Sequence, residues 1–267
     1  MTDLHIHTKF SPDSDARPES YVDTAMLCGA DKLGFSEHYD LDYVYNKFEV
    51  VMTDVAASHK SVQSLRELYR GKIEILEGIE FGYSPLAEEE YAAFEKKYPF
   101  DYIINSVHVP EGETDCWFLE YFGGREKKER YRKYFETVSR SLDAKFDFQI
   151  LGHLGYVARN APYFDPRVYY AEFSDILDEI LKKVVARGVA LEINSNVRSA
   201  GSPFIPYLDI LKRYRELGGE RISLGSDAHQ VRRLFDRFDL MREGLFSLGF
   251  TRTCFFRQKQ IYFEELS

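Results

Sequence analysis

The residues that could do chemistry begin at the N-terminus, where His5 and His7 form a His-x-His pair. Side chains alternate between the two faces of a β-strand, so we expect both imidazoles to project to one side while Leu4 and Ile6 pack on the other. Two neutral imidazoles held close together can bind zinc, manganese or iron. A single pair is weak evidence of a metal site, so more ligands must come from elsewhere in the chain.

Further residues of metal-ligand type follow apolar runs along the chain, and each run is typical of a buried strand. They are His38, Glu80, His108, His153, Asp227 and His229. Six of the seven histidines belong to this pattern or to the N-terminal pair, while His59 lies in a predicted helix. Random placement would rarely produce this distribution. The pattern therefore predicts one site that collects ligands from many strands.

The elements that must position these residues alternate between strands and helices. The apolar periodicity predicts strands over 3–7, 32–35, 102–107, 148–151, 189–193, 222–224 and from residue 73 onward, and helices over 18–27, 53–70, 85–97, 126–142, 168–187, 203–217 and 231–248. Strands that are each followed by a helix predict a parallel sheet with helical crossovers, which closes into a barrel. Barrel enzymes carry their active sites at the C-terminal ends of the strands, where the ligand-type residues fall. Segment 251–263 could form an extra terminal strand, and its structure is left open.

Composition limits the kind of protein to which such a site can belong. A chain of 267 residues fits one α/β barrel, so we expect a single domain over 1–267. A net charge of −9 argues against nucleic acid and anionic membranes as partners and leaves a small molecule. The three cysteines are too few and too widely spaced for a disulfide framework. No apolar run resembles a signal peptide or a membrane span, so we expect a cytoplasmic protein, whose oligomeric state is left open.

The order and spacing of these motifs resemble the PHP superfamily, which is named after polymerases and histidinol phosphatases. The motifs are Asp-Leu-His-Ile-His-Thr at 3–8, Ser-Glu-His-Tyr-Asp at 36–40, Ser-Val-His at 106–108, Gly-His at 152–153 and Ser-Asp-Ala-His at 226–229. They extend along almost the whole chain, and the likeness is greatest to the stand-alone histidinol-phosphate phosphatases of that superfamily. The resemblance implies a distorted seven-stranded (β/α)7 barrel with a trinuclear metal centre.

The resemblance also implies a set of metal ligands. It assigns His5, His7, Glu80 and Asp227 to one divalent ion, Glu80, His108 and His153 to a second, and Asp13, His38 and His229 to a third. We prefer Asp13 to Asp15 because its spacing to Glu19 matches the family better, and Asp15 stays an alternative. The ions could be manganese, zinc or iron, all of which accept imidazole and carboxylate ligands. We expect Glu74 and Glu77, which lie deeper in the same strand as Glu80, to be salt-bridge partners.

The predicted function is metal-dependent hydrolysis of L-histidinol phosphate, in histidine biosynthesis, by attack of a metal-bridging hydroxide. Asp227 would lie where the attacking water forms. His38, Asp40 and His229 are alternatives for the residue that relays a proton to the leaving oxygen. Two other functions stay open: a phosphoesterase that acts on a nucleotide or another small phosphoester, and a non-catalytic polymerase-accessory module.

Residues in loops beyond the strand ends are candidates for contacts with the substrate. Arg159 and Arg198 follow strands on the ligand side, and a guanidinium can bind two phosphate oxygens at once. The resemblance supports both as phosphate ligands. Trp117 and Tyr121, in the loop after His108, could cover the imidazole ring of the substrate or only pack the loop.

Overall fold

The structure is a computed structural model that describes residues 1–41, 53–197 and 202–266. Its strands are β1 (Lys32–Tyr39), β2 (Glu74–Gly82), β3 (Tyr102–Ser106), β4 (Ile150–Leu151), β5 (Ala190–Asn194), β6 (Ile222–Gly225), β7 (Arg252–Arg257) and β8 (Gln260–Glu265). Its helices are α1 (Pro18–Leu27), α2 (Val55–Leu68), α3 (Glu88–Phe94), α4 (Leu119–Phe122), α5 (Lys127–Ser141), α6 (Ser174–Arg187), α7 (Leu208–Glu216) and α8 (Phe238–Ser247), with 3-10 turns η1 (Tyr156–Ala158), η2 (Tyr170–Glu172) and η3 (Val231–Arg233).

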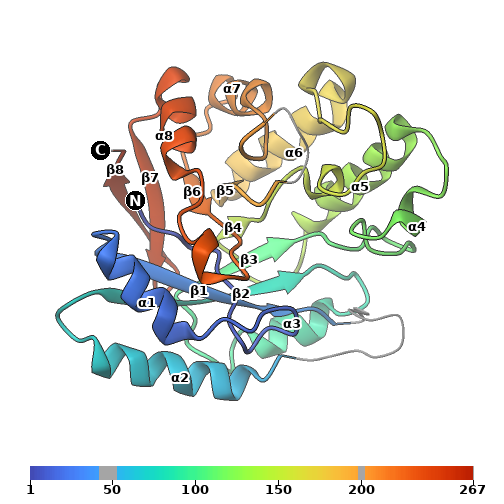
Figure 1. Cartoon of the computed structure of the whole chain (residues 1–267). Coiled ribbons are helices and arrows are strands. Elements are labelled where there is room, and N and C mark those ends of the chain that lie inside the picture. Colours follow the sequence, from blue (N-terminus) through green and yellow to red (C-terminus); the bar gives the residue numbers. More distant parts are fainter. Residues whose placement is uncertain (42–52, 198–201, 267) are drawn as a thin grey trace.

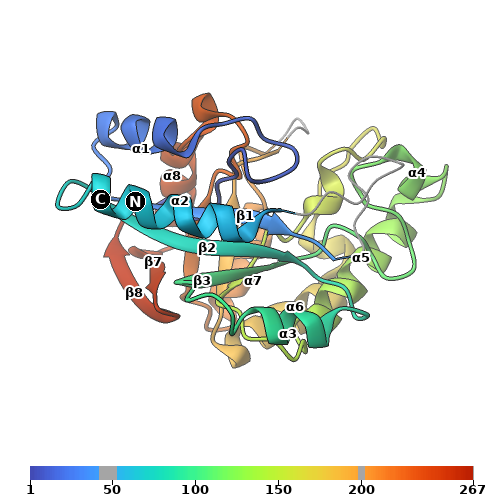
Figure 2. The same ribbon diagram turned by 90° about the horizontal axis from the view of Figure 1, so that it is seen from below.

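Strands β1 to β6 form one parallel sheet in sequence order, and each of the five connections between them carries at least one α-helix. The helices lie around the outside of the sheet (Figure 1, and from below in Figure 2). Buried residues fill these strands on both faces, as expected for parallel strands covered by helices on one side and by the barrel interior on the other. The predicted α/β barrel fold is therefore confirmed.

The N-terminal segment takes the seventh position of the barrel, between β6 and β1. The backbone N–H of Leu4 donates to the carbonyl of Leu224 at 3.0 Å, and the N–H of Gly34 donates to the carbonyl of Asp3 at 2.9 Å. The segment forms only isolated bridges, however, and not the regular strand predicted over 3–7. Leu4 and Ile6 therefore do not share a face as predicted. Leu4 packs inside the barrel, whereas Ile6 packs in a separate cluster beneath α1.

The barrel interior below the strand ends is filled by Tyr102. A Cβ at Gly34 would lie 2.3 Å from the hydroxyl oxygen of Tyr102, and a Cβ at Gly78 would lie 2.2 Å from its ring. Its hydroxyl donates to the carbonyl of Leu4 at 2.7 Å. Glycine at both positions therefore lets a large aromatic side chain pack under the site and hold the N-terminal segment in place.

Segment 251–263, left open by the sequence, contributes to an antiparallel hairpin of β7 and β8 outside the main sheet. Cys254, Phe255 and Phe256 of β7 pack with interior residues of the barrel. Figure 1 shows the hairpin close to the N-terminus and far from α4. It covers the end of the barrel opposite the site.

The predicted helices are present, and three of them begin five or more residues later than predicted. The expected helix over 168–187 begins at Ser174, because η2 precedes it as a separate turn. The expected helix over 231–248 is interrupted because Phe235 and Arg237 have positive φ angles, so that η3 and α8 replace one helix. The expected helix over 203–217 begins at Leu208. Among the described residues, no helix combines the length and the apolar character needed to cross a membrane.

Candidate metal centre and phosphate pocket

The ligand-type residues converge at the C-terminal ends of the parallel strands. His38 and Glu80 lie in the last residues of β1 and β2, while His108, His153 and Asp227 follow β3, β4 and β6 by two residues each. His5 and His7 enter from the N-terminal segment that closes the barrel. The structure thus brings together all nine residues that the sequence assigned as ligands, including Asp13 and His229.

Glu80 is the centre of this cluster, and its side chain is fully buried. Nitrogens of five imidazoles lie 2.8–3.6 Å from its carboxylate oxygens, and they belong to His5, His7, His38, His108 and His153. The hydroxyl of Ser106 also donates to Glu80 at 2.6 Å. Burial alone would raise the pKa of Glu80, but the surrounding histidines hold it well below its usual range. Glu80 is therefore an ionised carboxylate with imidazoles beside both of its oxygens, which is the arrangement expected of a residue that bridges two metal ions.

Asp227 forms the second carboxylate of the cluster, on the side of the first proposed ion. Its Oδ1 lies 3.4 Å from His7 Nε2 and 3.9 Å from His5 Nε2. Its backbone has a φ of 51°, a left-handed conformation that is uncommon outside glycine. Burial raises its pKa, but Arg159 and His5 outweigh this effect and hold the pKa well below the usual value. The carboxylate therefore stays ionised.

Asp13, rather than Asp15, lies beside the remaining histidines. Asp13 Oδ2 is 3.0 Å from His229 Nε2 and 3.5 Å from His38 Nε2. Asp13 and Asp15 are both exposed, but Asp15 makes no ion pair with any described residue. The two imidazole nitrogens lie 3.4 Å apart. These three residues form a group on the outer side of Glu80, at the position proposed for the third ion.

The donor atoms of the cluster fit divalent metal ions. The Nε2 atoms of His5 and His7 are buried and make no hydrogen bond within the described part of the chain, although carboxylate oxygens lie nearby. His108 directs its Nδ1 to Asp40 Oδ1 at 2.9 Å, and its other ring nitrogen, Nε2, faces Glu80. Imidazole and carboxylate atoms that converge in this way are typical ligands of transition metals.

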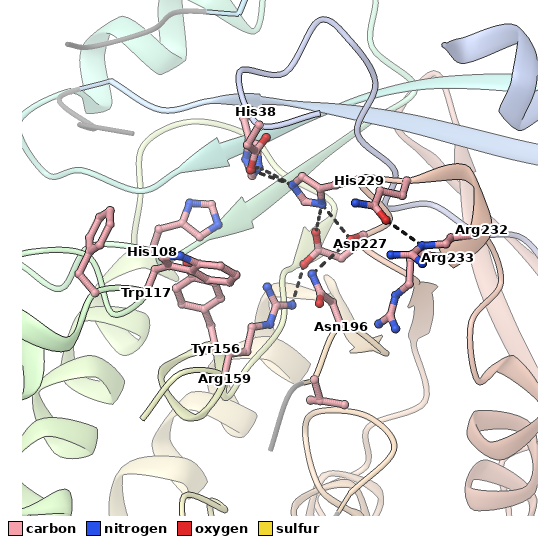
Figure 3. A pocket seen from close by; sticks show the side chains of 14 residues that line it. His38, His108, Trp117, Tyr156, Arg159, Asn196, Asp227, His229, Arg232 and Arg233 are labelled. Atoms are coloured by element: carbon pink, nitrogen blue, oxygen red, sulfur yellow. Dashed lines mark hydrogen bonds and ion pairs between the residues drawn. The ribbon is translucent and has the colours of Figure 1, made fainter. Parts of the chain in front are cut away.

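A cavity of about 520 Å³ opens onto the cluster (Figure 3). Trp117, Tyr156 and Arg159 lie on one side of it, and Arg232 and Arg233 lie on the other. Its volume is in the range of small-molecule sites. The cavity can therefore hold a substrate of the size of a phosphorylated amino alcohol next to the ligand cluster.

Arg159 lies between the cavity and the cluster. Its Nη2 is 2.7 Å from Asp227 Oδ2 and 2.8 Å from Asn194 Oδ1, while its buried Nε makes no hydrogen bond among the described residues. The guanidinium also stacks on the ring of Tyr156. Two contacts thus fix its orientation and leave donors toward the cavity.

Other predicted residues have different outcomes. Arg198 lies outside the described residues. Tyr121 is buried, and its hydroxyl donates to the carbonyl of Arg130 at 2.6 Å, so it packs the loop instead of lining the cavity. Asp40 contacts His108 and does not line the cavity either. Glu74 pairs with Arg257, and Glu77 pairs with His59 at 2.7 Å, as expected of carboxylates deeper in β2.

Sequence reasoning missed Glu192, Asn194 and Tyr156. Glu192 and Asn194 lie in β5, where both are buried next to predicted ligands. A carboxylate inside an otherwise apolar parallel strand is rare without a partner, and this was the signal available for Glu192. Tyr156 contacts His108 and His153 with its ring, and its aromatic character alone did not distinguish it from a core residue.

The fold and this site define a class of protein. The PHP domain family matches residues 3–196, and the chain belongs to that family. The chain is 35% identical over 229 residues to a Clostridium acetobutylicum protein named "Probable histidinol-phosphatase", covering 85% of this chain and 86% of that protein. It is 31% identical over 232 residues to the histidinol-phosphatase of Lactococcus lactis, covering 86% and 85%.

A solved structure is similar along the whole chain. It is the crystal structure of the Lactococcus lactis histidinol phosphate phosphatase in complex with zinc, L-histidinol and phosphate. The match has a TM-score of 0.89 at 30% identity and covers 98% of both chains. The resemblance seen in the sequence motifs is thereby confirmed.

Proposed function

We propose that this protein is a metal-dependent phosphomonoesterase that hydrolyses L-histidinol phosphate to L-histidinol and phosphate. The observation that carries the proposal is the convergence of six histidines and three carboxylates beside a cavity that Arg159 lines. The Lactococcus lactis relative, which shares the fold over 98% of both chains, was crystallised with zinc, L-histidinol and phosphate. This relationship supports the same substrate here.

Three divalent ions are the proposed cofactors, with the ligand sets that the resemblance to the PHP superfamily implies. Their ligands would be His5, His7, Glu80 and Asp227 for the first, Glu80, His108 and His153 for the second, and Asp13, His38 and His229 for the third. Divalent ions in such a site lower the pKa of a coordinated water and stabilise negative charge on phosphoryl oxygens. Zinc in the relative favours zinc, and manganese and iron suit the same donors.

The residues of the chain would position the phosphoryl group. Arg159 would bind phosphate oxygens through the donors that Asp227 and Asn194 leave unused. His38 and His229 line the cavity next to Asp227 and are the residues proposed to orient the attacking water and the leaving oxygen. Because the guanidinium is held on two sides, this arrangement is organised before the substrate binds.

Trp117 and Tyr156 would bind the leaving group. Both line the cavity on the side of Arg159, so an imidazole attached to the phosphate can reach an aromatic ring. Stacking between aromatic rings contributes about 0.5–1.5 kcal/mol beyond the buried area. These residues are the proposed source of selectivity for histidinol phosphate.

Arg232 and Arg233 favour one alternative substrate class. They line the cavity opposite Trp117, and a second anionic group on the substrate would be attracted to them. A nucleotide or another phosphoester with two anionic groups would use this side of the cavity. The alternative differs from the main proposal only in the leaving group.

The test is phosphate release by the purified protein after removal of metals and addition of zinc or manganese. We expect kcat/KM for L-histidinol phosphate to exceed that for nucleoside monophosphates at least about a hundredfold, which equals about 2.7 kcal/mol. Metal analysis should give close to three ions per chain. Equal values across the substrates would contradict the histidinol assignment. No release from any substrate at full metal content would favour the polymerase-accessory module.

The place of the reaction is a further part of the proposal. L-histidinol phosphate is an intermediate of histidine biosynthesis, so the protein would act in that pathway in the cytoplasm. Deletion of the gene should cause a growth requirement for histidine, and fractionation of cells should recover the protein with cytoplasmic enzymes.

A further inference from the structure

Glu192 is a buried carboxylate that belongs to no proposed ligand set. It lies in the middle of β5 and is 1% exposed. Its Oε1 lies 2.5 Å from Nδ1 of His5, and its Oε2 accepts a hydrogen bond from the backbone N–H of His153 at 2.6 Å. The side-chain amide of Asn194 donates to Oε2 as well, at 3.2 Å. All of these contacts are inside the barrel, directly beneath the ligand cluster.

The contact with His5 selects the tautomer of its imidazole. A carboxylate accepts only, so Nδ1 of His5 must carry the proton that it donates to Glu192. In the neutral ring Nε2 then presents its lone pair, and this atom lies 3.3 Å from Glu80 and 3.9 Å from Asp227. A histidine that binds a metal usually directs its other nitrogen to such a carboxylate. Glu192 thus aims His5 at the first proposed ion.

The contact with His153 acts through the backbone. The Nδ1 atom of the His153 ring is buried and has no hydrogen-bond partner within the described residues, so no acceptor holds the far side of this ring. The backbone N–H of the same residue is held by Glu192. Its Nε2 lies 2.9 Å from Glu80, in the set proposed for the second ion. One carboxylate therefore holds a ligand of each of two ions.

The space that Glu192 occupies is kept open by a glycine on the next strand. A Cβ at Gly225 would lie 2.2 Å from Glu192 Oε1 and 2.6 Å from the Cβ of His5. Real Cβ atoms do not approach other atoms this closely, and both neighbours are fixed by burial. Any larger residue at this position would displace the carboxylate, the histidine or both.

We propose that Glu192 is a positioning residue that fixes His5 and His153 and thereby raises the affinity of the first two metal sites. The inference rests on the proposed metal ligands, and it is independent of the identity of the substrate. Replacement of Glu192 by Gln keeps the shape of the side chain but turns one of its two acceptors into an amide donor. An amide at the position of Oε2 would face the backbone N–H of His153, and an amide at the position of Oε1 would require the proton of His5 to move to Nε2, the atom proposed to bind the metal.

Glu77 offers a matched control. It is a carboxylate in β2 that is 3% exposed, and its Oε1 lies 2.7 Å from Nδ1 of His59. Its partner lies on α2, outside the ligand cluster. Glu77→Gln therefore alters a buried glutamate and its contact with a half-buried histidine, without touching a proposed ligand.

The experiment measures zinc binding to the metal-free protein by competition with a chromophoric chelator, without substrate. We expect Glu192→Gln to weaken zinc binding at two of the sites about 10–100-fold relative to wild type. Glu77→Gln should leave zinc affinity unchanged, even if both variants unfold at a lower temperature. The visible spectrum of the cobalt-substituted protein should change in Glu192→Gln only, because the geometry around the ion is altered.

The outcomes separate this inference from the proposed function. Wild-type zinc affinity in Glu192→Gln, or an equal loss in both variants, would overturn the role of Glu192. Failure of the wild-type protein to bind zinc would instead contradict the proposed metal centre itself. If Glu192→Gln does not fold, Glu192→Asp tests the same contacts, because the shorter carboxylate cannot reach both His5 and His153, and it should weaken zinc binding in the same way.

Discussion

Arg159 and Asp227 form a buried ion pair in the wall of the cavity, with Nη2 of the arginine 2.7 Å from Oδ2 of the aspartate. The two side chains are 4% and 3% exposed. The other carboxylate oxygen, Oδ1, faces His7 at 3.4 Å. Asp227 therefore connects the proposed phosphate contact to the first proposed metal ion through its two oxygens.

Replacement of Arg159 by Ala should destabilise the metal-free protein. Removing one partner of a buried ion pair leaves the other charge uncompensated and costs about 3–5 kcal/mol. Bound metal would compensate Asp227 in its place, so the loss should be smaller in the metal-loaded protein. Urea unfolding with and without zinc measures the difference. The same variant should lower kcat/KM on every phosphomonoester, since Arg159 would contact only the shared phosphate.

Arg213→Ala is the control for this prediction. Arg213 pairs with Asp178 at 2.7 Å, but its side chain is 29% exposed, and it lies on α7 away from the cavity. We expect at most a small change in stability and normal activity, because solvent screens this ion pair. Retention of wild-type activity by Arg159→Ala would show that the guanidinium does not bind phosphate.

Asp13 and Asp15 allow a test of the third metal site with two neighbouring residues. Both side chains are exposed, but Asp13 lies 3.0 Å from Nε2 of His229, whereas Asp15 makes no ion pair with any described residue. We expect Asp13→Asn to bind about one metal ion fewer per chain, because an amide oxygen is a weaker ligand than a carboxylate. Asp15→Asn should keep the wild-type metal content and turnover. The reverse result by metal analysis would assign the ligand to Asp15.

Much of the site could be predicted because its residues follow apolar runs that form parallel strands. His38, Glu80, His108 and Asp227 all fall at strand ends, where the barrel geometry collects side chains. The position of each of these ligand-type residues could be read from the sequence because it follows an apolar run, and the end of that run marks the end of a strand. The side of the ring that each histidine presents could not be predicted, since it depends on acceptors such as Asp40 that only the fold brings near.

The misses have physical causes. Glu192 lies inside an apolar strand, and its role follows from its contacts with His5 and His153, which are distant in the sequence. In segment 3–7 polar and apolar residues alternate as in a strand, yet the segment lies between β6 and β1 and forms only isolated bridges. Tyr121 and Trp117 are both aromatic residues in the segment after His108, so the sequence alone does not show which of them faces the cavity. Packing against Arg130 turns Tyr121 away from the cavity.

Metal binding should release protons. Burial lowers the pKa of His108, but Asp40 and Glu80 outweigh it and raise the pKa to about 10. Asp13 and Glu80 likewise raise the pKa of His38 well above its usual value, against the effect of burial. These imidazoles therefore carry protons in the metal-free protein at neutral pH, and a metal needs them neutral. Zinc affinity should rise with pH, most steeply below the raised pKa values.

Calorimetry in two buffers with different ionisation enthalpies measures this proton release. The heat of zinc binding at pH 7.5 should differ between the buffers in proportion to the number of protons released. Identical heats in the two buffers would mean that the histidines are neutral before the metal binds. The Glu77→Gln variant should release the same number of protons as the wild type, because His59 is not a proposed ligand.

Trp117→Ala should lower activity on histidinol phosphate selectively. Trp117 lines the cavity beside Tyr156, where it can stack on an imidazole but has no role in binding the phosphate. We expect kcat/KM for L-histidinol phosphate to fall about tenfold, which equals about 1.4 kcal/mol. An aliphatic ester such as glycerol phosphate is the comparison substrate, since it has no ring to stack, and its kcat/KM should be unchanged.

Tyr121→Phe is the control, because it removes the buried hydrogen bond to Arg130 outside the cavity and should keep the ratio of kcat/KM for the two substrates. An equal fall for both substrates in Trp117→Ala would mean that the indole only supports the loop, and the selectivity would then have to come from other residues of the cavity.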